Sequence, residues 1–573
     1  MNNSPLVVQP ASCKDCHKCL RECPVAAIGF KDNQVFIIEE KCIYCGNCIK
    51  TCPQGAKSAL FEKEKLKAFL ASDSFLIASV APSFTAAFPG IKPGQLFTAL
   101  RKIGFNYIAE TAAAAAEVVE QFKLEIKKLD KPLITSCCPA VVNLIEKHFP
   151  ELLPQLAPVL SPMMLQAAEL KANFSKARVV FIGPCLAKIE EANQEKRRHY
   201  KPDIVITFTH LKKLFAEAGI NLAELSTAGV DLPTPLITAD YALSGGAVKA
   251  AEMLKADPGC GYQALHVSGL ANIINFLADL KKEAMSVEMV ELLACPGGCI
   301  SGPAIDNNLS IPVREMKIHS YLNNKRLSNE QAINLTKLNS LKRNHSDQKM
   351  KLPIPPESEI KKILASIGKE QPEDEKNCGG CGYSSCREKA IAVYHGFAER
   401  KMCIPYMKSR AESLSQIIVE SSHNAIIVVN SEMEIQKFNP LARKLFSQRN
   451  RKLAGLKLDK VMDSQMFKQA WQFEQRIIHQ KYSYKNETII VDQTIFALPE
   501  HKVIVGILTD ITEQEKQRLE VQKMKRLAVE KTNSVVNKQM QIVQEIAGLL
   551  GETTVETKAA LTDLADLLQA GDH

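Results

Sequence analysis

The sequence predicts a multidomain chain with a central α/β fold, flanked by small cysteine-rich domains, an α+β domain and C-terminal helices. Cysteines in regularly spaced groups open the chain and recur at residues 378–403. Short apolar runs, typical of buried strands, alternate with helical stretches between residues 75 and 320. Beyond residue 513 an apolar residue returns at every seventh position, which indicates a long helix. At 573 residues the chain has room for several domains.

The first 65 residues contain a duplicated cysteine run. It resembles the bacterial two-cluster ferredoxins, in which the fourth cysteine of each run binds the other 4Fe-4S cluster. The ligand sets implied are Cys13, Cys16, Cys19 and Cys52 for one cluster, and Cys42, Cys45, Cys48 and Cys23 for the other. Zinc is the alternative, but zinc does not require this duplicated rhythm. The segment 34–38 between the runs fits the hairpin of such ferredoxins.

Three cysteine-bearing loops dominate the central α/β part. They are Thr135-Ser-Cys-Cys-Pro139, Gly183-Pro-Cys-Leu-Ala-Lys188 and Cys295-Pro-Gly-Gly-Cys299. The first two follow directly on apolar runs, which suits a site in the crevice at the strand ends of an open sheet. The glycines of the third loop let the backbone pass close to a bulky inorganic group. A buried structural cysteine pair is the alternative for this loop taken alone.

Together, and in this order, the three loops resemble the signature loops of the FeFe hydrogenases, and the likeness extends over about residues 75–320. The resemblance implies an H-cluster: a 4Fe-4S cluster joined to a two-iron unit that carries CO, cyanide and a bridging azadithiolate. Cys299 would bridge the two parts, Lys188 would donate a hydrogen bond to a cyanide, and Cys137 would pass protons as a thiol of modest pKa. The implied 4Fe-4S ligands are Cys138, Cys185, Cys295 and Cys299; the implied pocket also includes Ala81, Pro82, Ser161 and Pro162.

The sequence departs from catalytic members of that family around the pocket. Gly183 and Leu293 stand where those members carry methionines, and Phe122 and Glu125 lie near the places of two glutamates of their proton path. These changes resemble the sensory branch, which binds or slowly turns over H2 and carries PAS domains. A catalytic, ferredoxin-linked hydrogenase with a regulatory tail is the alternative. A cluster-scaffold relative without the two-iron unit is a weaker third hypothesis.

The remaining chain is expected to carry the signal. Residues 326–357 are polar and then proline-rich, which predicts a linker. Residues 358–408 resemble the small helical 4Fe-4S domain of corrinoid and electron-transfer proteins, with a zinc knuckle as the alternative. Residues 410–512 resemble a PAS domain, in which His423 is expected to be a solvated turn residue rather than a haem ligand. The implied ligands of the third cluster domain are Cys378, Cys381, Cys386 and Cys403.

Residues 513–573 are predicted to form a helical signalling tail. Its apolar positions predict a pairing face for a homodimer, although charged residues interrupt the seam. Packing of this stripe back onto the PAS sheet is the alternative. Thr553–Glu556 reads as a capping box that starts a final short helix ending near Leu568. The tail contains no histidine before residue 573, so the output is expected to pass to a separate kinase or phosphatase. The heptad residues are Val521, Ala528, Val535, Ile542 and Leu549.

Charge and targeting signals narrow the partners. The formal charge is +9, but sixteen of the 18 cysteines fall into cluster patterns. Four clusters of about −2 each would bring the holoprotein to roughly +1, so we expect no nucleic-acid partner. The start of the chain lacks a leader pattern, and no run of 18 uncharged apolar residues occurs. We therefore expect a cytoplasmic protein without a membrane span, with H2, protons and a ferredoxin-like redox partner as its reactants. Cys260 fits no pattern.

Overall fold

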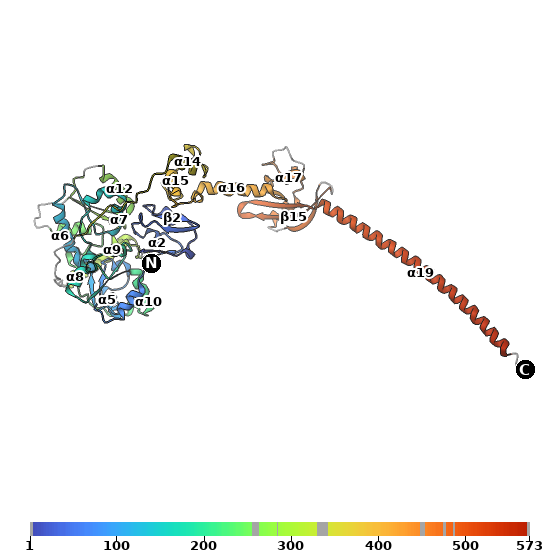
Figure 1. Ribbon diagram of the computed structural model, residues 1–573, viewed down its shortest axis with the longest axis horizontal. Coiled ribbons are helices and arrows are strands. Elements are labelled where there is room, and N and C mark those ends of the chain that lie inside the picture. The colour runs from blue at the N-terminus through green and yellow to red at the C-terminus, as the bar shows by residue number, and fades with distance from the viewer. Residues whose placement is uncertain are drawn as a thin grey trace. The chain divides into compact units, whose positions relative to one another are not determined.

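The computed structural model describes residues 4–254, 263–282, 285–328, 342–446, 453–473, 477–484 and 488–569 (Figure 1). Cys260 lies outside these ranges. The chain divides into two compact units, residues 1–407 and 408–573. Among the described residues, no helix is both long and apolar enough to cross a membrane.

The N-terminal part is built from two similar halves. Each half has one short helix, α1 (Lys18–Arg21) or α2 (Asn47–Lys50), close behind its first cysteines. β2 (Ile28–Lys31) pairs with β3 (Gln34–Ile37) in an antiparallel hairpin, with Ile28 opposite Ile37. The hairpin predicted between the cysteine runs is therefore confirmed. β1 (Leu6–Val8) and β4 (Lys57–Ala59) form a second antiparallel pair that joins the ends of the domain.

The central part contains two parallel sheets, where the sequence suggested one open sheet. The four-stranded sheet has the order β6-β5-β8-β9, and the three-stranded sheet has the order β10-β11-β7. The apolar run at Pro132 joins the second sheet because Leu133 pairs with Met289 rather than with a strand of the first. The strands are β5 (Leu76–Val80), β6 (Tyr107–Glu110), β7 (Leu133–Ile134), β8 (Arg178–Gly183), β9 (Ile204–Thr207), β10 (Ala264–Ser268) and β11 (Met289–Leu293).

Helices pack on both sheets and bury their central strands on both faces, as in other parallel sheets, whereas the edge strand β10 is partly exposed. Every residue of β5 and β11 is buried. The helical stretches predicted at 211–218 and 273–282 lie largely within α10 and α12. The helices are α3 (Lys63–Leu70), α4 (Phe84–Ala87), α5 (Pro93–Lys102), α6 (Ala115–Ile126), α7 (Pro139–His148), α8 (Pro162–Asn173), α9 (Ala187–Gln194), α10 (Phe208–Glu217), α11 (Gly246–Met253), α12 (Leu270–Leu280) and α13 (Ile311–Ser328).

The predicted linker is only partly a linker. Its first residues continue α13 to Ser328, and residues 329–341 lie outside the described ranges. Residues 342–348 pack on the central domain: Lys342 forms a β-bridge with Val159, and the Gln348 N–H donates to the Glu146 carbonyl (2.9 Å). The expectation of a free linker is wrong here because polar side chains of this segment find partners on the domain. α14 (Glu357–Ala365) and α15 (Cys386–Tyr394) follow, and α16 (Ile404–Ser421) runs across the boundary between the two units.

The second unit holds a five-stranded antiparallel sheet with the order β13-β12-β16-β15-β14. Strands occur where the sequence predicted them, in β12, β13 and β16. The exposed His423 lies in a bend before β12, as expected for a solvated turn residue. Its strands and helices are β12 (Ala425–Asn430), β13 (Ile435–Phe438), α17 (Pro440–Leu445), α18 (Gln465–Gln472), β14 (Ile477–Tyr484), β15 (Ile489–Leu498) and β16 (Val503–Asp510).

The tail is one helix, α19 (Thr512–Gln569), so the predicted break at Thr553 is wrong (Figure 1). The Thr554 hydroxyl donates to the Leu550 carbonyl one turn earlier, a bond that threonine makes inside a helix rather than at its start. The heptad residues are exposed along the helix; Val535 and Ile542, for example, are 57% and 53% exposed. The stripe therefore does not pack back onto the sheet of its own unit.

Candidate metal centre

The three signature loops each connect a strand to a helix or turn at the carboxyl end of a parallel strand. Cys138 caps the start of α7, and Cys185 lies between β8 and α9. Cys295 and Cys299 follow β11. Carboxyl ends of parallel strands are where open α/β sheets place their sites. The structure thus brings together the four cysteines that the sequence singled out.

The pKa values of these four thiols indicate that the thiols lie close to one another. Burial and the neighbouring Cys138 together raise the pKa of Cys185 to about 11. Burial also raises the pKa values of Cys295 and Cys299, with Cys138 and Cys185 again contributing to both. Each of the four retains some accessible surface although it lies deep in the domain, as side chains around a hollow do. Four buried thiols that oppose one another's ionisation fit a cationic iron core, which binds thiolates.

A cluster also explains why no single-ion site is found. Among the described residues, no three His, Cys, Asp or Glu side chains lie close enough together to hold one metal ion. The thiolates of a four-iron cluster each bind a different iron, so they stand farther apart than the ligands of one ion.

Close backbone packing holds the turn from Cys295 to Cys299. The Cys299 N–H donates to the Ala242 carbonyl (2.8 Å). A Cβ at Gly298 would lie 2.5 Å from that same carbonyl oxygen, and Gly298 has a φ of +96°. The glycine is thus required by a neighbouring backbone as well as by any inorganic group. From α13, Arg314 donates to the Ile300 carbonyl (3.2 Å) and fixes the far side of the turn.

Cys137 lies in a buried polar cluster that the sequence did not reveal. Its Sγ donates to Thr135 Oγ1 (3.5 Å), and burial together with Glu291 raises its pKa to about 12. The modest pKa expected for this thiol is therefore wrong for the polypeptide itself, because desolvation outweighs the nearby Lys188. Burial raises the pKa of Glu291 to about 7, against hydrogen bonding from N–H groups at the start of α11. Burial and the neighbouring Cys137 also raise the pKa of Tyr241.

Two of these groups have an unused polar atom. Glu291 Oε2 and the Tyr241 hydroxyl are buried and lack a hydrogen-bond partner among the described residues. A carboxylate inside the apolar run of β11 was the signal that could have identified Glu291 from sequence. Buried polar atoms without partners are costly, so they mark places where a ligand or water completes the structure.

Lys188 lies beside Cys137 and the two-iron position implied by the resemblance. Its Nζ donates to the Cys137 carbonyl (3.2 Å) and to Glu191 Oε2 (2.9 Å). An ammonium group has three hydrogens, so one remains for a ligand. Lys188 also interacts electrostatically with Cys185 and Cys299, which places its charge at the hollow.

The other predicted pocket residues stand at element ends near these loops. Ala81 and Pro82 follow β5, and the Ala81 N–H donates to the Ile182 carbonyl (2.9 Å) on β8. Ser161 and Pro162 start α8, and the fully buried Ser161 hydroxyl has no partner in the described structure. An unpartnered buried hydroxyl fits a polar ligand of the kind the resemblance implies.

Apolar rings occupy two of the positions that depart from catalytic members. A Cβ at Gly183 would lie 2.5 Å from Cε1 of Phe181, whose ring occupies that space. Phe122 is fully buried in an apolar cluster, and Glu125 is held by Lys128 (2.6 Å) on the same helix. Of these two positions only Glu125 carries a carboxylate, and that carboxylate is paired with Lys128.

The N-terminal cysteines gather into the two sets that the sequence implied. Cys13, Cys16, Cys19 and Cys52 line one hollow. Burial raises the pKa values of Cys42 and Cys45, and each is raised further by its neighbours, with Cys23 contributing to both. Cys48 is influenced by the same three thiols.

The second of these sets lies against the signature loops. A Cβ at Gly46 would lie 2.5 Å from the Pro303 Cβ, so the Cys45 loop touches the chain just after Cys299. Cys45 interacts electrostatically with Cys185. Lys50 Nζ donates to the Ser301 carbonyl and adds its charge between the two centres. Contact of this kind favours electron exchange between the sites.

The third cluster domain packs on the N-terminal domain. The Phe30 N–H donates to the Phe397 carbonyl (3.0 Å), and the Asp32 N–H donates to Glu399 (2.6 Å). Tyr383 interacts electrostatically with Cys23 of the second N-terminal set. Its cysteines line a common hollow and are Cys378, Cys381, Cys386 and Cys403. Sequence order alone, which places this domain after the central one, does not predict this contact.

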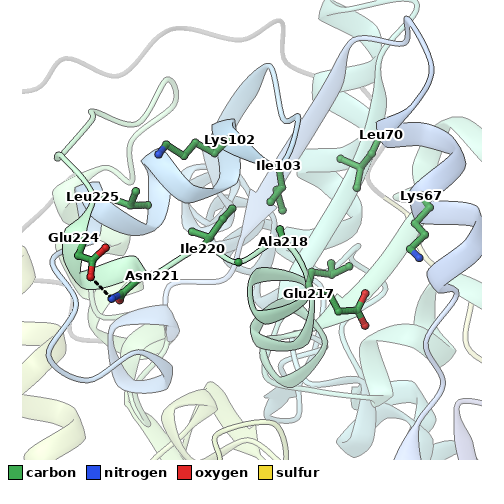
Figure 2. A pocket seen from close by; sticks show the side chains of 12 residues that line it. Lys67, Leu70, Lys102, Ile103, Glu217, Ala218, Ile220, Asn221, Glu224 and Leu225 are labelled. Carbon is green, nitrogen blue, oxygen red and sulfur yellow. Dashed lines mark hydrogen bonds between the residues drawn. The ribbon is translucent and has the colours of Figure 1, made fainter.

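A more open surface pocket lies away from all of these cysteines (Figure 2). It is bordered by the end of α10 and by residues of α3 and α5, and Asn221 donates to Glu224 at its edge. Its lining contains no cysteine or histidine, so we do not assign the metal chemistry to it.

Comparisons with known proteins agree with this arrangement. Residues 74–303 match the family model described as "Iron only hydrogenase large subunit, C-terminal domain". Residues 5–53 match a 4Fe-4S dicluster domain, and residues 374–405 match a putative Fe-S cluster.

Among curated relatives, the chain is 30% identical to the NADP-reducing hydrogenase subunit HndD of Solidesulfovibrio fructosivorans, over 48% of this chain and 57% of that protein. It is 24% identical to iron hydrogenase 1 of Clostridium pasteurianum, over 44% and 53%. It is also 23% identical to cytosolic iron-sulfur assembly component 3 of Mus musculus, over 46% and 70%. The chain thus spans less than two thirds of the length of the first two relatives.

The matches to solved structures are weaker than the family matches. An [FeFe]-hydrogenase structure covers 51% of this chain and 100% of its own at 20% identity, with a TM-score of 0.41. A PAS domain from Haloarcula marismortui covers 19% of this chain at 14% identity, with a TM-score of 0.16. Neither score carries an argument here. The family matches show that the chain has a domain like the C-terminal domain of the iron-only hydrogenase large subunit, preceded by a 4Fe-4S ferredoxin-like domain.

Proposed function

We propose that this protein is a sensory iron hydrogenase, which binds and slowly oxidises or evolves H2 at an H-cluster and relays the redox state to its C-terminal unit. The observation that supports this most is the order of cysteine sites in space. The signature loops contact the Cys45 loop, and the N-terminal set of Cys23 lies beside the Cys381 domain. That domain leads directly into α16 and the second unit.

When bound, the two-iron unit would supply H2 binding and cleavage. Cys138, Cys185, Cys295 and Cys299 would hold the 4Fe-4S cluster. Cys299 would also join that cluster to the two-iron unit. Lys188 has one hydrogen free to bind an outer ligand of the group. Cys137 keeps its proton at neutral pH because its pKa is raised, so after donating it would need an adjacent acid to return the proton.

The altered pocket supports slow turnover. Glu291, with a pKa raised to about 7, is the carboxyl group beside Cys137 that could take up a proton and return it to the thiol. Phe122 blocks the position where catalytic members carry a carboxylate. Proton transfer in step with electron transfer should then limit the rate.

The redox state would reach the output through the second unit, which we interpret as a PAS domain, and through α19. Its exposed heptad face would pair with a second copy, and reduction would favour one of two tail arrangements. We also propose a cytoplasmic location, a ferredoxin-like electron partner, and a separate kinase or phosphatase as the recipient of the signal.

Infrared spectroscopy of the fully matured protein tests the cofactor. We expect CO and cyanide stretching bands and roughly 18 irons per chain, from four clusters of four irons plus two. Absence of these bands after maturation would refute the hydrogenase. Turnover equal to that of a catalytic hydrogenase would instead support the ferredoxin-linked alternative.

A cluster scaffold without the two-iron unit is the second candidate, favoured by the match to cytosolic iron-sulfur assembly component 3. It predicts roughly 16 irons and no cyanide band. The free hydrogen of Lys188 and the unpartnered Ser161 hydroxyl argue for the hydrogenase, because both fit a polar ligand that a scaffold lacks.

A further inference from the structure

We propose that residues 342–348, here called the strap, position Lys188 through Glu191, and that Arg343 is the positioning residue. This inference rests on the proposed function, since it assigns a control element to the same pocket. The strap enters with the Arg343 N–H donating to the Pro158 carbonyl (3.1 Å) and with the Lys342–Val159 bridge.

Glu191 joins the strap to the pocket. Its side chain is 1% exposed, and its two oxygens bind two different cations. Oε1 accepts from the Arg343 guanidinium (2.8 Å), and Oε2 accepts from Lys188 Nζ (2.9 Å). Buried charges are stable only when they are paired and hydrogen-bonded, so each cation fixes the carboxylate for the other.

The hydrogen bonds to Glu191 and to the Cys137 carbonyl fix the orientation of the Lys188 ammonium group. With one hydrogen on Glu191 and one on the Cys137 carbonyl, the third hydrogen can point only away from both. If Arg343 is removed, Oε1 loses its partner and the carboxylate can rotate. Lys188 would then follow Glu191 or exchange this bond for water, and the third hydrogen would lose its orientation.

A second anchor ties the strap to the helix that starts at Cys138. The buried carboxylate of Glu146, on α7, accepts from His345 Nδ1 (3.2 Å) and from Gln348 Nε2 (3.0 Å). Glu191 belongs to α9, which starts just after Cys185. The strap thus braces the two helices whose N-terminal ends carry two of the four predicted cluster ligands.

The strap also connects to the third cluster domain. The His395 ring at the end of α15 hydrogen-bonds the Pro353 carbonyl (3.1 Å). Pro353 lies five positions after Gln348, so the Cα atoms of the two residues are at most about 18 Å apart. This short segment and the His395 contact give the pocket a covalent and hydrogen-bonded link to that domain beside the electron route.

The test compares Arg343→Gln, which removes the charge, with Arg343→Lys, which keeps it. Lys342→Gln is the matched control, because the exposed Lys342 contacts the domain through its backbone. The measurement is the rate at which an amine-acylating reagent labels Lys188 in the full chain with its 4Fe-4S clusters in place, followed by mass spectrometry. Loss of one charge-assisted hydrogen bond of ordinary strength corresponds to about tenfold in an equilibrium constant.

We expect Arg343→Gln to raise Lys188 labelling about tenfold, Arg343→Lys to raise it less, and Lys342→Gln to leave it unchanged. Equal labelling in all four proteins would overturn the proposal. If Arg343→Gln fails to hold its clusters, the same comparison is made with Gln348→Ala at the second anchor, where unchanged labelling would also count against the strap.

A second measurement separates this proposal from the proposed function. In matured protein, Arg343→Gln should shift the cyanide stretching bands while Lys342→Gln leaves them in place. If the parent shows no cyanide band, the hydrogenase fails but the labelling result still decides the role of the strap. If the bands are present and identical in Arg343→Gln and the parent, the strap does not orient Lys188 toward the cofactor.

Discussion

Replacing Gly183 with methionine, the residue that catalytic members carry there, should destabilise this protein rather than improve it. A Cβ at position 183 would lie 2.5 Å from Cε1 and 2.8 Å from Cζ of Phe181. Carbon atoms pack best at about 3.5–4.0 Å, so the ring has to move by about 1 Å or more. Phe181 is 2% exposed and sits on a central strand, so it has little room. We expect a cost of about 1–3 kcal/mol, the usual range for overpacking a core.

Phe181→Ala alone should cost about 3–5 kcal/mol because it empties the same space. If the ring is the obstacle, the double variant should cost less than the sum of the two, by about 0.5–3 kcal/mol. Unfolding of a chain that loses its clusters is irreversible, so the unfolding rate under anaerobic denaturant is the quantity to compare. A destabilisation of about 1.4 kcal/mol accelerates unfolding about tenfold when the contact is absent from the transition state.

Gly229→Met is the matched control, since a Cβ there meets nothing within 4 Å and its φ is not in the left-handed region. We expect the control to unfold at close to the parental rate. The reasoning fails if Gly183→Met is as stable as the control, or if the effects of Gly183→Met and Phe181→Ala simply add.

Three further predictions concern other parts of the chain. The carboxyl band of protonated Glu291 should disappear with a midpoint near pH 7 in infrared titration, since burial raises the pKa and keeps the acid neutral below it; the band should be missing in Glu291→Gln. Cys137→Ala should lower turnover further while the CO and cyanide bands persist, and normal turnover would remove this thiol from the proton path. The full chain should be a dimer by light scattering and a chain ending at Ile511 a monomer, because the exposed stripe of α19 is lost; monomers in both cases would refute the pairing face.

Local sequence signals predicted the cysteine sets because cysteine spacing along a chain is itself the signal. The duplicated run predicts that Cys52, from the second run, joins the three cysteines of the first set. In the structure Cys52 lines the same hollow as those three cysteines. The resemblance to a PAS domain likewise predicted β12, β13 and β16, and β12 is buried at every second position.

Contacts between distant segments account for what the sequence did not predict. Glu191 and Arg343 are separated by 152 residues, and no local pattern indicates that one will pair with the other. The ring of Phe181 beside Gly183 depends on how a strand packs, so the glycine looked like an empty position rather than a filled one. The predicted helix start at Thr553 was wrong for the opposite reason. Thr553–Glu556 has the local pattern of a capping box, but these residues lie inside α19, which continues through them.

Some of the positively charged side chains of the protein lie beside its cysteine sets. Each cysteine set has a lysine beside it: Lys57 Nζ donates to Cys19 Sγ (3.2 Å), Lys147 Nζ donates to the Cys42 carbonyl (2.8 Å), and Lys389 lies among Cys381, Cys386 and Cys403. Lys188 does the same at the signature loops.

Three of these lysines are only 1–7% exposed, namely Lys57, Lys147 and Lys389. Lysine is almost never fully buried in proteins unless its charge is paired. Without an anionic partner, buried cations of this kind would be expensive. A 4Fe-4S core with four thiolates carries about −2 and supplies that partner at each place. These four lysines therefore place part of the chain's positive charge beside the cysteine sets, and a chain deprived of its clusters should lose order first around them.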